Sequence, residues 1–173
     1  LRESLLEIEL VQRDISNHLT GIQRDLFGLV GNPIFQRAVT NLKEQTGPTT
    51  RVNHLFEDVA TVRRLYNQVR FLDQRGMERI RVDFDGHTSH IISNEKLQNK
   101  HGKSYFRDAF TLPEEELYLS RMDLNMEHGK LERPFKPMLR YATPVLHEGE
   151  RQGVMVFNLF AQNIIDMLPR DIL

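Results

Sequence analysis

The first 30 residues carry the pattern that most restricts how this chain can fold. Apolar side chains recur there at alternating spacings of three and four residues, with Gln12 as the one polar interruption. This spacing predicts one continuous α-helix, about 45 Å long at a rise of about 1.5 Å per residue. Such a stripe packs either on the protein's own sheet or on the same helix of a second copy. Its members are Leu1, Leu5, Ile8, Ile15, Leu19, Ile22, Leu26 and Leu29.

Two further helices are predicted before the first strand. The motif GNP at 31–33 ends the long helix, because glycine and proline punctuate helices, and a short amphipathic segment follows at 34–44. The motif TGPTT at 46–50 breaks that segment. A third helix is expected over residues 51–67, where apolar side chains repeat at helical spacing.

The rest of the chain reads mainly as strands. Alternation with period two predicts strands over 67–73 and 77–84, and the Asp85-Gly86 pair is a hairpin signal that leads into a return strand within 87–93. The most apolar strand, VMVFNLFA, is expected at the centre of the sheet. The remaining elements are a helix in the second half of 94–112, strands over 115–120, 137–147 and 154–161, and a closing helix over 162–168.

This order of elements predicts the fold class. Helices come first and sequentially adjacent strands follow, which favours an α+β fold with a mostly antiparallel sheet. No internal repeat, low-complexity tract or long linker divides the chain. We therefore expect a single domain over 1–173, with a helical N-terminal part at 1–65 and a sheet core at 66–165.

Composition excludes several classes of function. The chain has 173 residues, of which 39% are hydrophobic and 27% charged, the balance of a globular domain with one core. A net charge of -1 argues against a protein that binds nucleic acid or a membrane surface. The absence of cysteine excludes disulfide scaffolds, cysteine zinc sites and thiol catalysis. No run reaches the roughly 18 apolar residues of a membrane span. Both ends look like cuts in a longer protein.

The sequence contains no recognisable catalytic or metal motif. Aligning Gly86 with the fixed glycine of an EF-hand loop puts Arg81 at the first ligand position and Ile92 at the position of the bidentate glutamate, so calcium is not expected. His87 and His90 are three residues apart in a predicted strand, which places them on opposite faces. The motifs of zinc proteases, serine hydrolases and nucleotide-binding loops are missing. We expect no enzymatic activity, no metal and no cofactor.

A candidate binding site gathers around the long segment 120–137. The stretch KSYFRDA places Lys103 and Phe106 on one helical face, with Tyr105 close by. Other polar residues come from the strands that flank the long segment. A sheet face covered by a helix would enclose such a mixture of aromatic, cationic and hydroxyl groups around a small polar ligand. The candidate ligand-binding residues are Lys103, Tyr105, Phe106, Tyr118, Ser120, Asp123, Arg140 and Thr143.

The same residues also have a purely structural interpretation, which the sequence leaves open. Tyr105 and Phe106 would then be core aromatics. Arg140 would be paired with a loop carboxylate such as Glu127 or Glu132. Spacing alone does not separate the two interpretations.

Four stretches together resemble the extracytoplasmic PAS-like sensor domains called Cache (or PDC) domains. The similarity is greatest to the membrane-distal half of double-Cache sensors of bacterial histidine kinases, diguanylate cyclases and chemoreceptors. It covers about 66–165, and the first 65 residues match only in their helical layout. The stretches are YNQVRFLDQRGMERIRVDFDG, KLQNKHGKSYFRDAF, LYLSRMDLNMEHGKLERPFKPMLRYATPV and RQGVMVFNLFAQNII.

The resemblance implies a five-stranded antiparallel sheet, a long N-terminal helix along it, and a pocket between the sheet and a helix–loop layer. Members of the family bind amino acids, carboxylates or other small metabolites there. Lys103 stands where an arginine often precedes the aromatic pair, and the tryptophan of the amino-acid-binding subset is absent. The resemblance places one group of residues on the pocket and a second group opposite. These are Lys103, Tyr105 and Phe106, with Ser120, Asp123, Arg140 and Thr143 opposite.

The resemblance implies the periplasmic or extracellular sensor domain of an inner-membrane signalling protein. It would bind a small molecule, one containing a carboxylate being a candidate, and pass the signal through its helices. The long N-terminal helix offers a homodimer contact. Two alternatives stay open at this point: a ligand-free structural or dimerisation module of the same fold, and a soluble cytoplasmic PAS-like regulator. The segment 122–137 is expected to form a structured flap beside the pocket, stiffened by its prolines.

Overall fold

A computed structural model describes residues 2–43, 48–127 and 129–168. The helices among them are α1 (Arg2–Val30), α2 (Pro33–Val39), the 3-10 helix η1 (Asn41–Lys43), α3 (Thr50–Val62), the 3-10 helix η2 (Asn94–Lys96), α4 (Ser104–Thr111) and α5 (Gln162–Ile165). The strands are β1 (Tyr66–Asp73), β2 (Glu78–Phe84), β3 (Ser89–Ile91), β4 (Tyr118–Leu119), β5 (Asp123–Leu124), β6 (Met126–Glu127), β7 (Lys130–Leu131), β8 (Pro137–His147) and β9 (Glu150–Phe160).

The strands form one antiparallel sheet in the order β3-β2-β1-β9-β8-β4, and a separate hairpin of β6 and β7. The predicted α+β class and antiparallel sheet are confirmed. The main sheet has seven strands, two more than the resemblance implies. The two additional strands are β4 and β5, which have two residues each and both pair with β8. The apolar strand β9 lies between β1 and β8, so its predicted central place is also confirmed.

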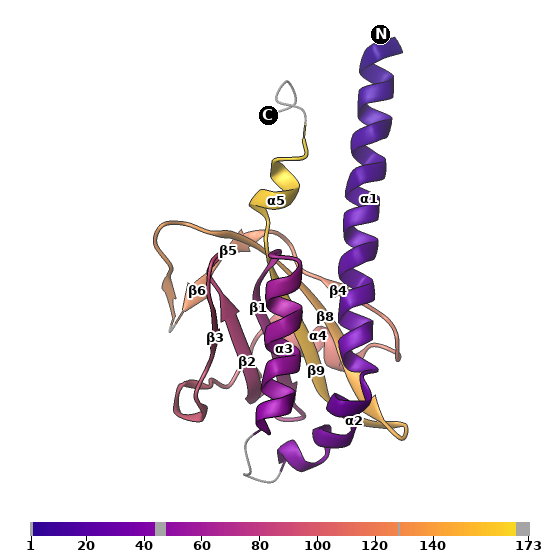
Figure 1. The fold of residues 1–173 in the computed structure, drawn as a ribbon. Helices are drawn as coiled ribbons and strands as arrows, with labels where there is room; N and C mark the ends of the chain where they lie inside the picture. Colours follow the sequence, from indigo (N-terminus) through magenta and orange to yellow (C-terminus); the bar gives the residue numbers. More distant parts are fainter. Residues whose placement is uncertain (1, 44–47, 128, 169–173) are drawn as a thin grey trace.

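Helices α1 and α3 lie side by side over one face of the sheet (Figure 1). The C-terminal half of α1 carries Ile22, Leu26 and Leu29, which are buried in the main core. The N-terminal half extends past the sheet, and Leu5 and Ile8 there are 55% and 41% exposed. The apolar stripe therefore packs on the protein's own core along only half of its length.

The third helix is shorter than predicted. It ends at Val62 rather than at residue 67, and Arg64 adopts a left-handed φ of 54°. Tyr66 then starts β1, where it pairs with Leu159 of β9 and is fully buried. Leu65 and Tyr66 fit the helical spacing of the preceding residues, which is why the helix was predicted to continue. In the structure, the backbone groups of Tyr66 form strand hydrogen bonds with β9 instead.

The segment 122–137, predicted as a flap and called the flap from here on, contains short paired stretches. Asp123 of β5 pairs with Met138 of β8, and the hairpin of β6 and β7 follows. The backbone N–H of Asn125 donates to the carbonyl oxygen of Lys136 at 3.0 Å, which closes the flap onto the start of β8. The flap is thus anchored to the sheet edge at its two ends.

Further boundaries differ from the predictions. The closing helix α5 ends at Ile165 rather than at residue 168, and the strand predicted over 115–120 is reduced to β4. Strand β9 begins at Glu150 rather than at residue 154, because the turn after β8 needs only Glu148 and Gly149. The helix predicted over 34–44 is divided into α2 and η1, and residue 44 lies outside the described part. Within the described residues, no helix combines the length and the apolar character that crossing a membrane requires.

Candidate functional site

The two faces of the sheet bury different kinds of side chain, because successive residues of a strand point to opposite faces. On the face covered by α1 and α3, the strands contribute the large apolar core. On the face covered by α4, the strands contribute a small apolar cluster next to a group of polar residues. The apolar cluster consists of Leu72, Tyr105, Phe106, Ala109, Ala142, Val154 and Val156.

The polar residues form a row across the three central strands. In the strand register, Asn158 of β9 lies opposite Gln68 of β1 on one side and opposite Arg140 of β8 on the other. The side-chain nitrogen of Asn158 donates to Gln68 Oε1 at 3.0 Å. All three side chains are buried, at most 8% exposed. Buried polar groups are costly unless they are paired, so this row needs an explanation.

Arg70 lies beside this row and is 2% exposed. Its guanidinium donates to Asn158 Oδ1 at 2.6 Å, to Glu78 Oε1 at 3.3 Å and to the Tyr105 hydroxyl at 3.3 Å. The Nε of Arg70 is buried and has no hydrogen-bond partner among the described residues. Arg70 is thus held by three side-chain hydrogen bonds and keeps one buried donor atom without a partner.

Helix α4 closes this face. Lys103 occupies its N-cap position, and the ring of Tyr105 lies under two guanidinium groups, 5.2 Å from Arg70 and 5.5 Å from Arg140. Such cation–π contacts hold the two arginines at fixed positions around one aromatic ring. The first turn of α4 also faces the pocket, so the positive end of its dipole adds to the cationic character.

The flap closes the remaining side through Asp123. The Asp123 carboxylate pairs with the Arg140 guanidinium. Their environments differ strongly, because the side chain of Arg140 is 9% exposed and that of Asp123 is 58% exposed. The buried partner comes from the long strand β8 and the exposed partner from the two-residue strand β5.

Together these groups enclose a cavity of about 100 Å³. Its walls come from β1, β8 and β9, from the start of α4 and from the flap. It is lined by Gln68, Arg70, Lys100, Lys103, Ser104, Tyr105, Asp123, Leu124, Asn125, Met126, Arg140 and Asn158.

Four of the eight predicted site residues line this cavity, namely Lys103, Tyr105, Asp123 and Arg140. Among the other four, Phe106 points into the apolar cluster and stacks on Phe110 with ring centroids 5.5 Å apart. The structure therefore brings together the cationic and aromatic part of the predicted site. Whether these residues bind a ligand remains a prediction.

Tyr118, Ser120 and Thr143 do not line the cavity. Tyr118 packs against the small apolar cluster, and the Ser120 hydroxyl accepts a hydrogen bond from the Arg140 backbone N–H at 2.9 Å. Thr143 lies an odd number of residues from Arg140 in the same strand, so the two side chains point to opposite faces. Thr143 lines a separate cavity of about 300 Å³ and donates to the Glu116 carbonyl oxygen.

The structural interpretation expected Arg140 to be paired with a loop carboxylate such as Glu127 or Glu132. Arg140 is paired with a loop carboxylate, but that carboxylate is Asp123. Glu132 instead accepts hydrogen bonds from Lys136 at 2.5 Å and from Asn125 at 2.7 Å. The side chain of Glu127 lies outside the described part of the structure.

Sequence reasoning missed Gln68, Arg70, Lys100 and Asn158. Two signals were present in the sequence. Asn158 is the one polar residue within the apolar run VMVFNLFA, and Gln68 and Arg70 occupy alternate positions of a strand whose other face is apolar. A polar residue at a buried position of a central strand is a better indication of a site than a polar residue in a loop.

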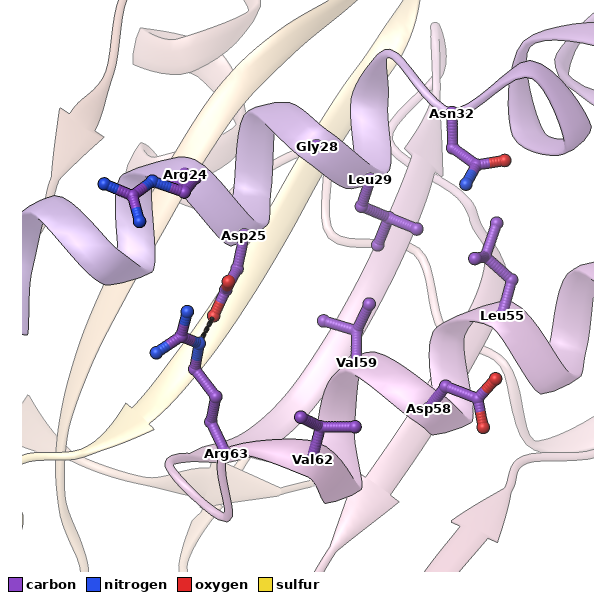
Figure 2. Close-up of a pocket in the computed structure, with 10 residues that line it drawn as sticks. All are labelled: Arg24, Asp25, Gly28, Leu29, Asn32, Leu55, Asp58, Val59, Val62 and Arg63. Atoms are coloured by element: carbon purple, nitrogen blue, oxygen red, sulfur yellow. Dashed lines mark ion pairs between the residues drawn. The ribbon is translucent and has the colours of Figure 1, made fainter.

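A larger cavity of about 320 Å³ lies between α1 and α3 on the other face (Figure 2). Figure 2 shows Leu29, Val59 and Val62 along its length and the ion pair between Asp25 and Arg63 at one end. None of the described residues that line it carries a buried polar atom without a partner. We therefore regard the smaller polar cavity as the candidate site.

Comparison with known proteins agrees with this architecture. The sequence profile of the family "Bacterial histidine kinase, sensor domain" matches residues 26–169. A search of curated protein sequences finds no significant match. The profile covers α3, the whole sheet, the flap and the C-terminal end of α1.

Two solved structures share 25% sequence identity with the chain. One is the extracellular domain of vpHK1S-Z8, a protein assigned as a histidine kinase, with a TM-score of 0.82 over 96% of this chain and 59% of that one. The other is a domain of a protein assigned to the sensory box/GGDEF family from Vibrio parahaemolyticus. Its TM-score is 0.78, over 91% of this chain and 59% of that one.

More distant structures share the fold. The sensory domain of the Campylobacter jejuni chemoreceptor Tlp3, solved with isoleucine bound, has 9% identity and a TM-score of 0.66 over 93% of this chain and 59% of that one. The ligand-binding domain of the Pseudomonas aeruginosa amino acid chemoreceptor PctC, in complex with GABA, has 15% identity. Its TM-score is 0.60, over 97% of this chain and 64% of that one.

The chain spans about three fifths of the length of these solved domains. The family profile covers most of the chain, and the sheet, the long helix and the covering helices correspond to those of extracellular sensor domains. This chain belongs to the bacterial histidine kinase sensor-domain family.

Proposed function

We propose that the chain is the ligand-binding sensor domain on the periplasmic side of a bacterial inner-membrane signalling protein, and that its ligand occupies the cavity under α4 and the flap. The domain performs no catalysis itself. The signal passes to an output domain elsewhere in the protein, such as a histidine kinase or a diguanylate cyclase. The extracellular neighbours and the family match support this proposal.

One observation carries the proposal. Gln68, Asn158 and Arg140 form a buried polar row across three strands, and Arg70 next to it keeps an unpartnered Nε. Leaving a donor unpaired in a protein interior costs free energy, about 1 to 3 kcal/mol. A core that served packing alone would carry apolar side chains at these positions, so the polar row that lines the cavity favours a polar ligand.

The size of the cavity limits the ligand. A volume of about 100 Å³ is well below the roughly 300–1,000 Å³ of pockets for drug-sized molecules. We therefore propose a ligand of few non-hydrogen atoms. Isoleucine and GABA, bound by the distant neighbours Tlp3 and PctC, set the scale of the compounds to be tested.

Helix α1 is the proposed output element. Its C-terminal half packs on the sheet face opposite to the cavity, so a change in the spacing of β1, β9 and β8 alters the surface on which α1 rests. Ligand can shift this arrangement only by its differential affinity for the two states. We propose that residues 1–173 act as one sensing unit.

Thermal unfolding of the chain against a panel of small carboxylates, amino acids, polyamines, purines and sugars tests the proposal. A true ligand at one hundred times its dissociation constant adds about 2.7 kcal/mol to the free energy of unfolding. Arg140→Ala and Tyr105→Ala should abolish the shift in midpoint. Arg24→Ala removes a cation that lines the larger cavity and is the matched control, which should keep the shift.

Loss of the shift in Arg24→Ala and its retention in Arg140→Ala would place the ligand between α1 and α3 and contradict the proposed site. A panel that shifts no midpoint would favour the alternative of a ligand-free structural module.

We also propose a homodimer through the exposed N-terminal half of α1. Four apolar side chains within six residues of this helix are between 41% and 59% exposed, and gathered exposed apolar side chains mark interaction sites. They are Leu5, Leu6, Ile8 and Leu10. Ile22 and Leu26 cannot serve this contact, because they are buried in the protein's own core.

Sedimentation equilibrium tests the dimer. The pair of substitutions Leu5→Glu and Ile8→Glu should convert the dimer into a monomer while the circular dichroism spectrum stays unchanged. Asn17→Glu with Gln23→Glu adds the same charge to exposed polar positions of α1 and should leave the dimer intact. A monomeric wild-type protein would remove the proposal.

A further inference from the structure

We propose that Asp123 determines the ligand specificity of the cavity: its carboxylate acts as an internal counter-anion on Arg140, and the ligand is a small anion, a carboxylate or a phosphate, that displaces it. This inference rests on the proposed function and deepens it. It assigns both a chemical class to the ligand and a role to the ion pair between flap and sheet.

The charge of the cavity favours an anion. Arg70, Lys100, Lys103 and Arg140 line it, and Asp123 is the one carboxylate among its described lining residues. Glu78, which is buried and does not line the cavity, is paired with Arg70 and with Arg81. The first turn of α4 also faces the cavity, and a helix N-terminus stabilises negative charge.

The two partners of the ion pair are held very differently. Arg140 lies within the eleven residues of β8, receives the Tyr105 ring under its guanidinium and is almost fully buried. Asp123 lies in a strand of two residues, and more than half of its side chain is exposed. Because its carboxylate already contacts water, releasing Asp123 costs far less than desolvating Arg140 without a partner.

A ligand can therefore replace Asp123 as the partner of Arg140. An incoming carboxylate or phosphate takes the place of the Asp123 carboxylate on Arg140, in a cavity that Lys103 also lines. A neutral or cationic molecule offers Arg140 no replacement charge, so Asp123 stays in place. Exchange detaches Asp123 from Arg140 and loosens β5 from β8, which links occupancy of the cavity to the flap.

The test compares binding of acetate, succinate and inorganic phosphate to wild type and to Asp123→Asn, by calorimetry at constant ionic strength. Asp123→Asn removes the carboxylate that competes with the ligand, so a larger fraction of the protein has Arg140 available for an anion. The variant should therefore bind the preferred anion about fivefold more tightly. Asp108→Asn removes the same charge from an exposed position of α4 and is the matched control, expected to bind as wild type does. Arg140→Gln should bind none of the three. Preference for phosphate over both carboxylates would identify the anion as a phosphate.

The sign of the effect decides the outcome. Equal or weaker anion binding by Asp123→Asn overturns the inference, because removal of a carboxylate that competes for Arg140 can only strengthen the binding of an anion there. Failure of all three anions to bind either protein overturns the anion assignment. A neutral or cationic compound from the wider panel that still needs Arg140 would then keep the proposed sensor function. If Asp123→Asn does not fold, Asp123→Ser provides the same comparison.

Discussion

The guanidinium of Arg70 donates a 2.6 Å hydrogen bond to the amide oxygen of Asn158 on the neighbouring strand. This bond fixes the orientation of the Asn158 amide, whose nitrogen therefore points to Gln68. Arg70 also reaches Glu78, so a buried charge on β1 is balanced by a buried charge on β2. The floor of the cavity is thus a connected polar network, held in place before any ligand arrives.

Removal of Arg70 should strongly destabilise the protein. Arg70→Met leaves the fully buried Glu78 without its closest cation, and breaking a buried ion pair costs about 3 kcal/mol or more. Urea denaturation should show this loss as a lower midpoint with an unchanged slope.

The double variant Arg70→Met with Glu78→Gln is the control for this prediction. It removes both charges, so it should be more stable than Arg70→Met alone. A double variant that loses as much as the two single variants combined would show that the two side chains do not stabilise each other.

Tyr105 should contribute mainly through its ring. Tyr105→Phe keeps the ring beneath Arg70 and Arg140 and removes only a hydroxyl that accepts at 3.3 Å, so the expected loss is about 1 kcal/mol or less. Tyr105→Leu also removes both cation–π contacts and should cost about 2 to 3 kcal/mol. Urea denaturation of the two variants measures the difference. Equal losses would show that the hydroxyl matters and the ring does not.

Gly153 should not tolerate a side chain. A Cβ at this position would lie 1.9 Å from the carbonyl oxygen of Leu72, in the neighbouring central strand. Because backbone cannot move away as a flexible side chain would, Gly153→Ala should cost about 3 kcal/mol or more. Gly102→Ala is the matched control, since a Cβ there meets nothing within 4 Å. Thermal unfolding should show a large loss for Gly153→Ala only, and equal midpoints would contradict the packing argument.

His18 of α1 should make stability depend on pH. Its Nε2 is buried without a partner among the described residues, and burial, followed by the charge of Arg63, lowers its pKa. The folded state therefore binds fewer protons than the unfolded state once the pH falls below about 6.5. The free energy of unfolding should decrease as the pH falls from 7 toward 5.

Replacement of His18 should flatten this dependence. His18→Gln removes the titrating group, so its free energy of unfolding should change less between pH 7 and 5 than that of wild type. His87→Gln removes an exposed histidine of the β2–β3 hairpin and should keep the wild-type slope. An unchanged slope in His18→Gln would show that other groups control the acid response.

Several features could be predicted because they depend on neighbouring residues only. Apolar residues at alternating spacings of three and four form one stripe along a helix, independently of the rest of the protein, and the structure contains that helix. The uninterrupted apolar character of residues 154–157 could only suit a strand buried on both faces, and β9 is central. Helical spacing also predicted α4, but not which of its residues face the cavity. Lys103 and Phe106 were expected on one face, whereas Lys103 and Tyr105 line the cavity and Phe106 lies in the apolar cluster.

Other features depend on how distant segments align, which no local pattern contains. Gln68, Asn158 and Arg140 meet because the register of two strand pairs places them opposite one another, and a shift of one residue would send each to the other face. The same alternation excludes Thr143 from the cavity, although it was predicted together with Arg140. Asp123, rather than Glu132, pairs with Arg140 because β5 docks on β8. Register is decided by packing summed over the whole sheet, so these contacts exist only in the tertiary structure, whereas the helix, the central strand and the fold class follow from the order of residues along the chain.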